Sequence, residues 1–333
     1  MKKRLIAVCD SDKKYLERLQ ENLGSNRGFP FSVDTYTDTE KLNENLKERE
    51  YELILAAGEA FEKLKDKGTA SLVLLKEPGR ESFSGKTVKK YQSADGIRRE
   101  ILGLCADSDS IAEVPSEERK TTVIGVYSPA GRDLQTAFSL LTGQLLAKKK
   151  RVLYLNMEPF SGFKEMLDSK TDRDLTDLIY YLLSGRDKLK YKLESLVGNV
   201  GGLDYVSPAF SFVDLTQVSK ENWLLLINTL VSCGNYDYLI LDLSEIVQGL
   251  LNILAMCDVI YTISSKDEIG KAKIKEYEAL LESEELDHVL ERMRRFEVPE
   301  TEALPLEPEE LPYSKLAPHV KRLLKESGEF LNE

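Results

Sequence analysis

A strand, a loop, a helix and a second strand follow one another from Thr121 to Glu158, and this order constrains the fold more than any other stretch does. Apolar runs occupy 122–127 and 151–155, and both are typical of buried strands. Between them lie a polar turn over 128–136 and a helical pattern over 137–148. This order predicts an α/β domain that binds phosphate at the loop, with a plain strand-to-helix turn as the alternative.

A third apolar run, 238–241, ends at Asp242. A strand without polar positions is typical of the centre of a parallel sheet, where helices cover both faces. Ligands of open α/β sheets bind at the carboxyl ends of such strands. We therefore expect Asp242 to lie beside the loop, with capping of the following segment as the other role open to its carboxylate.

The loop resembles the P-loop of the MinD/ParA ATPases, which reads Lys-Gly-Gly-x-Gly-Lys-Thr. Gly131 and Thr136 match this pattern, whereas Arg132 replaces a glycine. Ala130 stands at the position of the signature lysine that crosses the dimer, and Gln135 at that of the phosphate-binding lysine. Glycines let backbone N–H groups face phosphate, and lysines offset its charge. The resemblance therefore implies a degenerate nucleotide site without meaningful ATPase activity.

The same resemblance assigns roles to residues after the next two strands. Asn156 and Glu158 occupy positions where the family has an aspartate pair near the attacking water and the metal, and Asp242 corresponds to the Walker B aspartate. We expect no catalytic residue and no cofactor, although the resemblance by itself allows ATP with Mg²⁺, held by Thr136 and Asp242. The vestigial nucleotide site it implies consists of Gly131, Arg132, Gln135, Thr136, Asn156, Glu158 and Asp242.

Strand and helix patterns also alternate over residues 1–106, and this part resembles the receiver domains of response regulators. Asp10 and Asp12 follow the first strand, as the Mg²⁺-binding acidic pair of receivers does. The phosphoacceptor position at the end of the third strand falls on Ala56-Ala57, and either Lys89 or Lys90 stands near the usual lysine of the fifth strand. The resemblance implies a receiver-shaped docking module without phosphotransfer.

The chain of 333 residues is long enough for two doubly wound α/β domains. We expect a receiver-like, flavodoxin-like domain over 1–106, a polar linker over 107–120, and a MinD/ParA-like domain over 121–333 that ends in a C-terminal helix. Hydrophobic residues at 42% and charged residues at 31% are typical of a soluble globular protein. A short charged helix is expected over 288–295.

The net charge and the hydropathy of the chain limit which kinds of partner and location we expect. The formal net charge of −11 argues against a nucleic-acid partner. No apolar stretch reaches transmembrane length, and the run behind the basic start is stopped by Asp10, too early for a signal peptide. We expect a cytoplasmic protein that reaches the inner face of the cell membrane only through partners.

Both predicted domains together resemble the TadZ/CpaE-like pilus-assembly proteins, which join an atypical receiver to a MinD-like domain. The resemblance implies a pseudo-ATPase scaffold or localisation factor for Flp/type IV pilus (tight adherence) assembly, acting as a homodimer and through contacts with secretion proteins. An ATP-binding switch in which Arg132 substitutes for lysine is the alternative, and a ParA-like DNA-partitioning factor is the least favoured. The stretches that carry the resemblance are 155–163, 174–181, 203–208 and 235–243.

Overall fold

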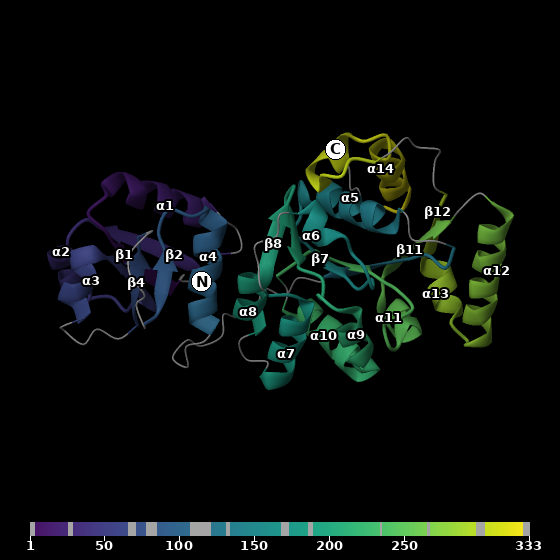
Figure 1. The fold of residues 1–333 in the computed structure, drawn as a ribbon, viewed down its shortest axis with the longest axis horizontal. Helices are drawn as coiled ribbons and strands as arrows, with labels where there is room; N and C mark the ends of the chain where they lie inside the picture. Colours follow the sequence, from purple (N-terminus) through teal and green to yellow (C-terminus); the bar gives the residue numbers. More distant parts are fainter. Residues whose placement is uncertain are drawn as a thin grey trace. The chain divides into compact units, whose positions relative to one another are not determined.

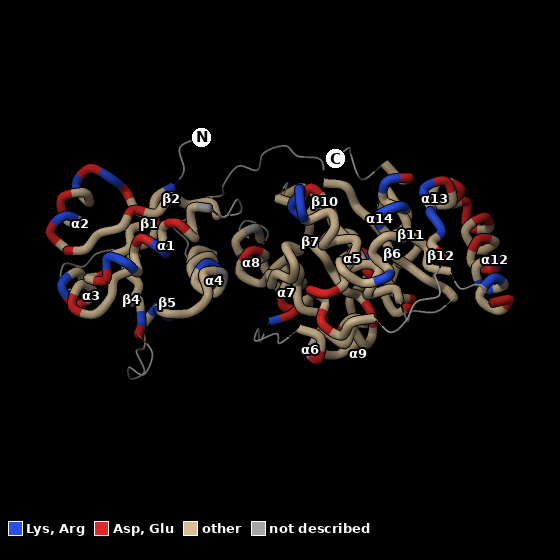
Figure 2. The backbone as a smooth tube through the Cα atoms, turned by 90° about the horizontal axis from the view of Figure 1, so that it is seen from above, with Lys and Arg blue, Asp and Glu red and all other residues tan. Residues whose placement is uncertain are grey.

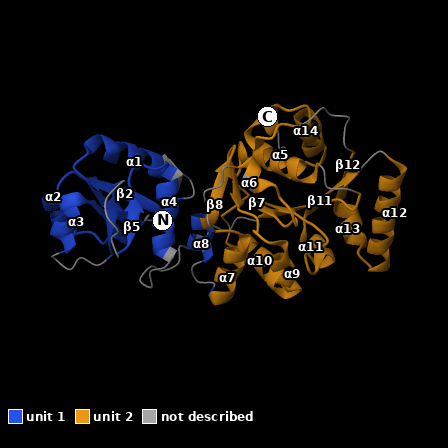
Figure 3. Ribbon diagram, in the orientation of Figure 1, with its two compact units in different colours: residues 1–115, 185–195 blue, residues 116–184, 196–333 orange. Residues whose placement is uncertain are grey.

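The structure, a computed structural model, divides into two compact units (Figure 3). One comprises residues 1–115 with 185–195, and the other residues 116–184 with 196–333. The residues described below are 4–25, 29–65, 71–77, 85–106, 121–130, 134–167, 173–185, 189–233, 235–264, 267–297 and 304–328.

The first unit contains a five-stranded parallel sheet in the order β2-β1-β3-β4-β5. This is the strand order of the flavodoxin-like doubly wound fold, so the α/β class expected for this part is confirmed. Its elements are β1 (Arg4–Cys9), α1 (Lys13–Ser25), β2 (Phe31–Tyr36), α2 (Thr39–Asn45), β3 (Leu53–Ala57), α3 (Gly58–Lys65), β4 (Leu72–Lys76), β5 (Thr87–Lys89) and α4 (Ala94–Ala106).

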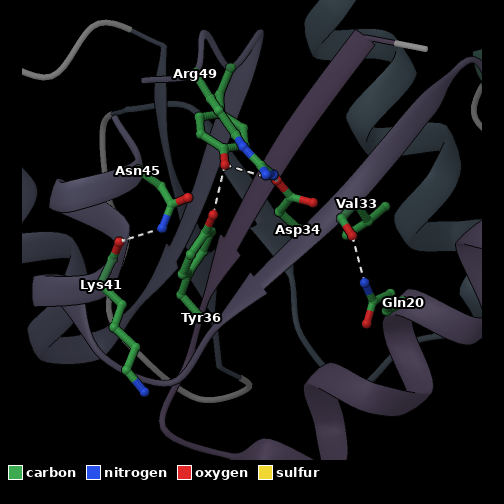
Figure 4. A network of polar contacts seen from close by, with 8 residues as sticks. Gln20, Val33, Asp34, Tyr36, Lys41, Asn45 and Arg49 are labelled. Atoms are coloured by element: carbon green, nitrogen blue, oxygen red, sulfur yellow. Dashed lines mark hydrogen bonds and ion pairs between the residues drawn. The ribbon is translucent and has the colours of Figure 1, made fainter. Parts of the chain in front are cut away.

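Polar side chains fasten neighbouring segments to the edge strand β2 (Figure 4). Asp34 accepts hydrogen bonds from Arg49 Nη1 at 2.9 Å and from the Tyr51 hydroxyl at 2.8 Å. Gln20 Nε2, on α1, donates to the carbonyl of Val33 at 2.7 Å. These bonds hold α1 and the connection that follows α2 against the strand, and charged groups on an edge strand also discourage pairing with other chains.

The second unit is built on a seven-stranded sheet in the order β12-β11-β6-β10-β7-β9-β8. All neighbours run parallel except β8 and β9, which are antiparallel. The strands are β6 (Thr122–Tyr127), β7 (Val152–Asn156), β8 (Val197–Val200), β9 (Leu203–Val206), β10 (Tyr238–Asp242), β11 (Val259–Ser264) and β12 (Met293–Glu297).

Helices cover both faces of this sheet, with α5 and α14 on one side and α7, α10 and α11 on the other (Figure 1). Helix α5 is buried along most of its length between the strands and the C-terminal segment. The helices are α5 (Gln135–Ala147), α6 (Phe163–Met166), α7 (Leu175–Ser184), α9 (Phe212–Gln217), α10 (Lys220–Ser232), α11 (Leu250–Met256), α12 (Glu268–Ser283), α13 (Asp287–Arg292), the 3₁₀ helix η1 (Pro308–Tyr313) and α14 (Ala317–Glu326).

The charged helix expected over 288–295 is shorter in the structure. Helix α13 ends at Arg292, and the charged residues that follow form the edge strand β12 instead of continuing the helix. Phe296 is buried in the core, whereas Arg294 and Arg295 are exposed, as an edge strand with one covered face allows. None of the helices in the described ranges is both long and apolar enough to span a bilayer.

The predicted site lies at one edge of the second sheet, where the parallel strands β6, β10 and β7 end. In the register of β10, Asp242 lies opposite Val126 of β6 and opposite Asn156 of β7. Helix α5 begins at Gln135, eight residues after β6 ends at Tyr127. Because parallel strands end at the same edge, the end of β7, the end of β10 and the first turn of α5 converge.

A short helix, α8 (Leu189–Leu196), packs largely with the first unit, although its sequence position lies within the predicted domain 121–333. The side chain of Tyr191 is 2% exposed and belongs to the core of the first unit, where its ring stacks on Phe31 with centroids 6.3 Å apart. Arg98 Nη1 donates to Glu194 Oε2 at 2.8 Å, and both side chains are buried. Helix α8 therefore completes the core of the first unit.

Replacing Tyr191 by Ala should destabilise the first unit by about 3–5 kcal/mol, because the substitution leaves a large cavity in its core. Tyr191→Phe should cost about 1 kcal/mol, since it removes only the hydrogen bond from Arg4 Nη1 at 3.2 Å. Hydrogen exchange of β1 and β2 amides measures both effects. Tyr180→Ala, at a position 65% exposed on α7, is the matched control. Equal protection in Tyr191→Ala and Tyr180→Ala would contradict the assignment of α8.

Candidate functional site

The site centres on the carboxylate of Asp242, which is fully buried at the end of β10. Gln135 Nε2 donates to its Oδ1 at 2.7 Å. The Tyr154 hydroxyl and Asn156 Nδ2 donate to its Oδ2 at 2.7 and 3.2 Å. A buried carboxylate needs such donors, since the loss of hydration is otherwise costly. Asp242 is thus held by three neutral donors of the protein itself.

Gln135 is the first residue of α5 and is fully buried. Its Nε2 also donates to the carbonyl of Leu243 at 2.8 Å, so both hydrogens of the amide are directed toward the end of β10. The Oε1 atom of Gln135 has no hydrogen-bond partner within the described ranges. The residue at the position of a phosphate-binding lysine therefore faces the aspartate.

Thr136 and Glu158 form the second contact of the site. The Thr136 hydroxyl donates to Glu158 Oε2 at 3.0 Å. The backbone N–H of Glu158 in turn donates to Asn156 Oδ1 at 3.0 Å, while Asn156 Nδ2 contacts both Tyr154 and Asp242. Asn156 thus links the Thr136–Glu158 pair to the buried carboxylate.

Burial sets the acid–base properties of the centre. It raises the pKa of Asp242 from 3.8 to about 6, while hydrogen bonds from Gln135 and Tyr154 act in the opposite direction. Burial and the neighbouring Asp242 raise the pKa of Tyr154 well above its ordinary value. Tyr154 therefore remains a neutral hydrogen-bond donor at physiological pH.

The described side chains do not fit Mg²⁺ with ATP as they stand. Both oxygens of Asp242 accept hydrogen bonds, so a cation there would face the N–H and O–H donors of Gln135, Tyr154 and Asn156. The Thr136 hydroxyl is directed to Glu158. Among the residues that the structure describes, no group of three or more His, Cys, Asp or Glu could hold a metal ion.

Five of the residues predicted for this site lie together in the structure: Gln135, Thr136, Asn156, Glu158 and Asp242. The predicted Gly131 and Arg132 lie outside the described residues. Sequence analysis missed Tyr154, which donates the other 2.7 Å bond to Asp242. Its signal was a phenol within an apolar strand, because a buried tyrosine hydroxyl normally finds a partner.

The first unit has a buried ion pair at the carboxyl edge of its sheet. Lys90 Nζ lies 2.8 Å from Asp10 Oδ2, and both side chains are buried. Lys90, and not Lys89, is thus the lysine beside the acidic position. Cys9 pairs with Ala56 in the register of β1 and β3, so Ala57 follows at the level of Asp10. At this level of the sheet the third strand therefore presents only a methyl group.

Comparisons with known proteins support the fold of the second unit. No known protein-family profile and no curated protein sequence matches the chain. A ParA family ATPase from Chlorobium tepidum TLS is similar in structure, with a TM-score of 0.50, 18% identity and coverage of 63% of this chain and 100% of that one. A P-loop ATPase fold of the MinD/ParA type is therefore present, as predicted.

Two further structures show weaker likeness. MinD from Aquifex aeolicus has a TM-score of 0.48 and 16% identity, over 64% of this chain and 99% of that one. A plasmid partition protein from Borrelia burgdorferi has a TM-score of 0.46 and 12% identity, over 63% of this chain and 99% of that one.

Replacing Gln135 by Ala should cost about 1–3 kcal/mol of stability at pH 7, because the ionised Asp242 loses a buried donor. The raised pKa means that the folded protein keeps a proton that the unfolded chain releases between pH 3.8 and about 6. The contribution of Asp242 to the free energy of unfolding should therefore fall as pH rises through this window. The cost of Gln135→Ala should shrink as pH falls below about 6, since protonated Asp242 depends less on the donor.

Gln144→Ala is the matched control for this substitution. Gln144 lies on the same helix, is 1% exposed, and donates through Nε2 to the neutral carbonyl of Pro308 at 2.9 Å. Its cost should not change with pH. Urea unfolding of both variants from pH 4.5 to 8 measures the difference. Parallel pH profiles for the two variants would contradict the assigned role of Gln135.

Proposed function

We propose that this protein is a pseudo-ATPase scaffold or localisation factor that acts through protein contacts. The observation that carries the proposal is the hydrogen bond from Gln135 to the buried Asp242. In a working P-loop, the lysine at this position binds phosphate and the aspartate serves the metal. Here the Gln135 amide donates to the aspartate instead, so a neutral side chain of the protein occupies the carboxylate that would serve the metal.

The missing lysines argue for the same function. Ala130 and Gln135 leave both lysine positions of the loop without a cation. Removing one group that stabilises transition-state charge costs on the order of 3 kcal/mol, or roughly two orders of magnitude in rate. Two such losses together leave hydrolysis far below a useful rate.

The biological setting follows from the resemblance to TadZ/CpaE-like proteins. We infer a role in assembly of Flp/type IV pili of the tight adherence type, with pilus secretion proteins as partners. The receiver-like first unit fits a docking role, because Ala57 stands at the acceptor level and Lys90 is already paired with Asp10. Homodimer formation and a cytoplasmic location, at the membrane only through partners, belong to the same proposal.

An ATP-binding switch is the second candidate, and one contact favours it. Thr136 and Glu158 lie 3.0 Å apart beside Asp242, at the start of α5. A rearrangement that released these three side chains would expose oxygen ligands suited to Mg²⁺. A thermal shift that requires both ATP and Mg²⁺ and disappears in Asp242→Ala would favour the switch.

Calorimetric titration with ATP and Mg²⁺, repeated with ADP, tests the pseudo-ATPase proposal. We expect no binding heat and an unchanged melting temperature, because Asp242 and Thr136 are already bonded within the protein. Phosphate release should stay at the level of a protein-free blank. Micromolar binding, or release that Asp242→Ala abolishes, would overturn the proposal in favour of the switch.

The proposed dimer gives a separate prediction. Sedimentation equilibrium should report a mass of about twice 37.7 kDa both with and without Mg²⁺ and ATP, because the contacts of a scaffold need no nucleotide. A monomer under both conditions would remove the homodimer from the proposal. A dimer that forms only with ATP would instead indicate the switch.

A further inference from the structure

Exposed aromatic side chains gather beside the site, on the loop after β7 and at the start of α9. Phe160 is 82% exposed, Phe210 is 80%, Phe212 is 40% and Val213 is 47%. The rings of Phe160 and Phe212 lie 5.7 Å apart, so residues from distant parts of the sequence meet there. We call these four residues the aromatic patch. Exposed apolar groups of this size that cluster together commonly mark a binding surface.

The loop that carries Phe160 is held in place by the Asp242 network. Phe163, three residues further on, is buried and stacks on Tyr154 with centroids 5.7 Å apart and planes 7° apart. Tyr154 in turn donates to Asp242. Gly162 makes the turn between the two phenylalanines with a φ of +69°, a conformation that favours glycine.

The other half of the patch is also fixed. The backbone N–H of Phe210 donates to Asp174 Oδ2 at 3.0 Å. Ser211 caps α9 by accepting from the N–H of Val213. Contacts within the unit therefore hold the backbone of both halves of the patch, so binding needs to order only the side chains.

Acidic residues surround the patch. Glu165 on α6, Asp177 on α7 and Asp214 on α9 lie on the elements that border it, and Figure 2 shows acidic positions on these helices. In the bordering segments 158–167, 173–185 and 207–217 the sequence has five acidic residues and two basic ones, Lys164 and Arg173. The surroundings of the patch are thus negatively charged, like the chain as a whole at −11.

We propose that the aromatic patch binds a segment of another protein that combines apolar side chains with Lys or Arg. Apolar side chains of the segment would cover Phe160 and Phe210, and its basic groups would face Glu165 and Asp214. This inference rests on the proposed scaffold function, and it names the chemistry of a partner. Because Tyr154 and Phe163 tie the patch to the Asp242 network, the surface is available without nucleotide.

A second copy of the chain fits this surface less well. In a symmetric dimer the same patch lies on both sides of the contact, so Glu165 and Asp214 would face the acidic rim of the other copy. Like charges at the rim of an interface disfavour association. The charge around the patch therefore selects a basic partner over another copy of this acidic one.

A labelled synthetic peptide of leucine and lysine at helical spacing serves as the probe, and fluorescence anisotropy measures its binding to the full chain. The double variant Phe160→Ser/Phe210→Ser should bind the peptide at least about tenfold more weakly than wild type. Tyr313→Ser, at a position 89% exposed on η1, should leave affinity unchanged. Glu165→Lys/Asp214→Lys should also weaken binding, whereas Glu309→Lys/Glu310→Lys on η1 should have little effect. Unchanged melting temperatures establish that the variants are folded.

Several outcomes would overturn the inference. Equal affinity of wild type and Phe160→Ser/Phe210→Ser would show that the peptide binds elsewhere. Equal affinity for a peptide with glutamate in place of lysine would show that the acidic residues around the patch do not select a basic partner. A dimer that dissociates in Phe160→Ser/Phe210→Ser would make a second copy the occupant. The calorimetric titration with ATP is independent of these results, so failure of the pseudo-ATPase proposal and failure of the patch can be told apart.

Discussion

The carboxylate of Asp242 is the group on which the arrangement of the second unit's ligand edge depends. Burying an ionised carboxylate costs free energy unless hydrogen-bond donors of the protein replace the water that it loses. Those donors come from α5 and β7, the two elements that the parallel sheet brings to the end of β10. Gln135, Tyr154 and Asn156 all direct hydrogen-bond donors at Asp242, so both oxygens of that carboxylate are occupied by the protein. The requirement to satisfy one buried charge thus determines the chemistry of the whole edge.

Buried polar contacts lie at the carboxyl edge of the sheet in both units, and they differ in kind. In the first unit, Lys90 neutralises Asp10 by a buried ion pair, and Ala57 stands at the level of Asp10 on the neighbouring strand. In the second, neutral donors hold Asp242, so its charge stays near the α5 N-terminus, where the helix dipole favours it. In each unit the acidic side chain at the carboxyl edge of the sheet is held by contacts within the protein.

Sequence patterns were sufficient for the sheet classes and for the meeting of Gln135, Asn156 and Asp242, because unbroken apolar runs predict parallel strands whose carboxyl ends coincide. They could not predict which side chains would bond to one another. Tyr154 reads as one more buried residue, and its role emerges only from the register of β7 against β10. The sequence also did not predict that α8 packs on the first unit. Tyr191 and Glu194 look like ordinary helical positions, and their partners Phe31 and Arg98 lie far away in the sequence.

The Asp242 network also bears on how the aromatic patch would be controlled. A ligand shifts a conformational equilibrium only by its difference in affinity for the two states. A nucleotide that found Asp242 already bonded would first have to displace Gln135 and Tyr154, and disturbing Tyr154 would disturb Phe163, which stacks on it. Binding of nucleotide would therefore disorder the loop that carries Phe160, and an ordered loop would in turn disfavour nucleotide binding. A binding surface that is ordered without nucleotide would be available to a partner at all times. This property suits a scaffold better than a switch.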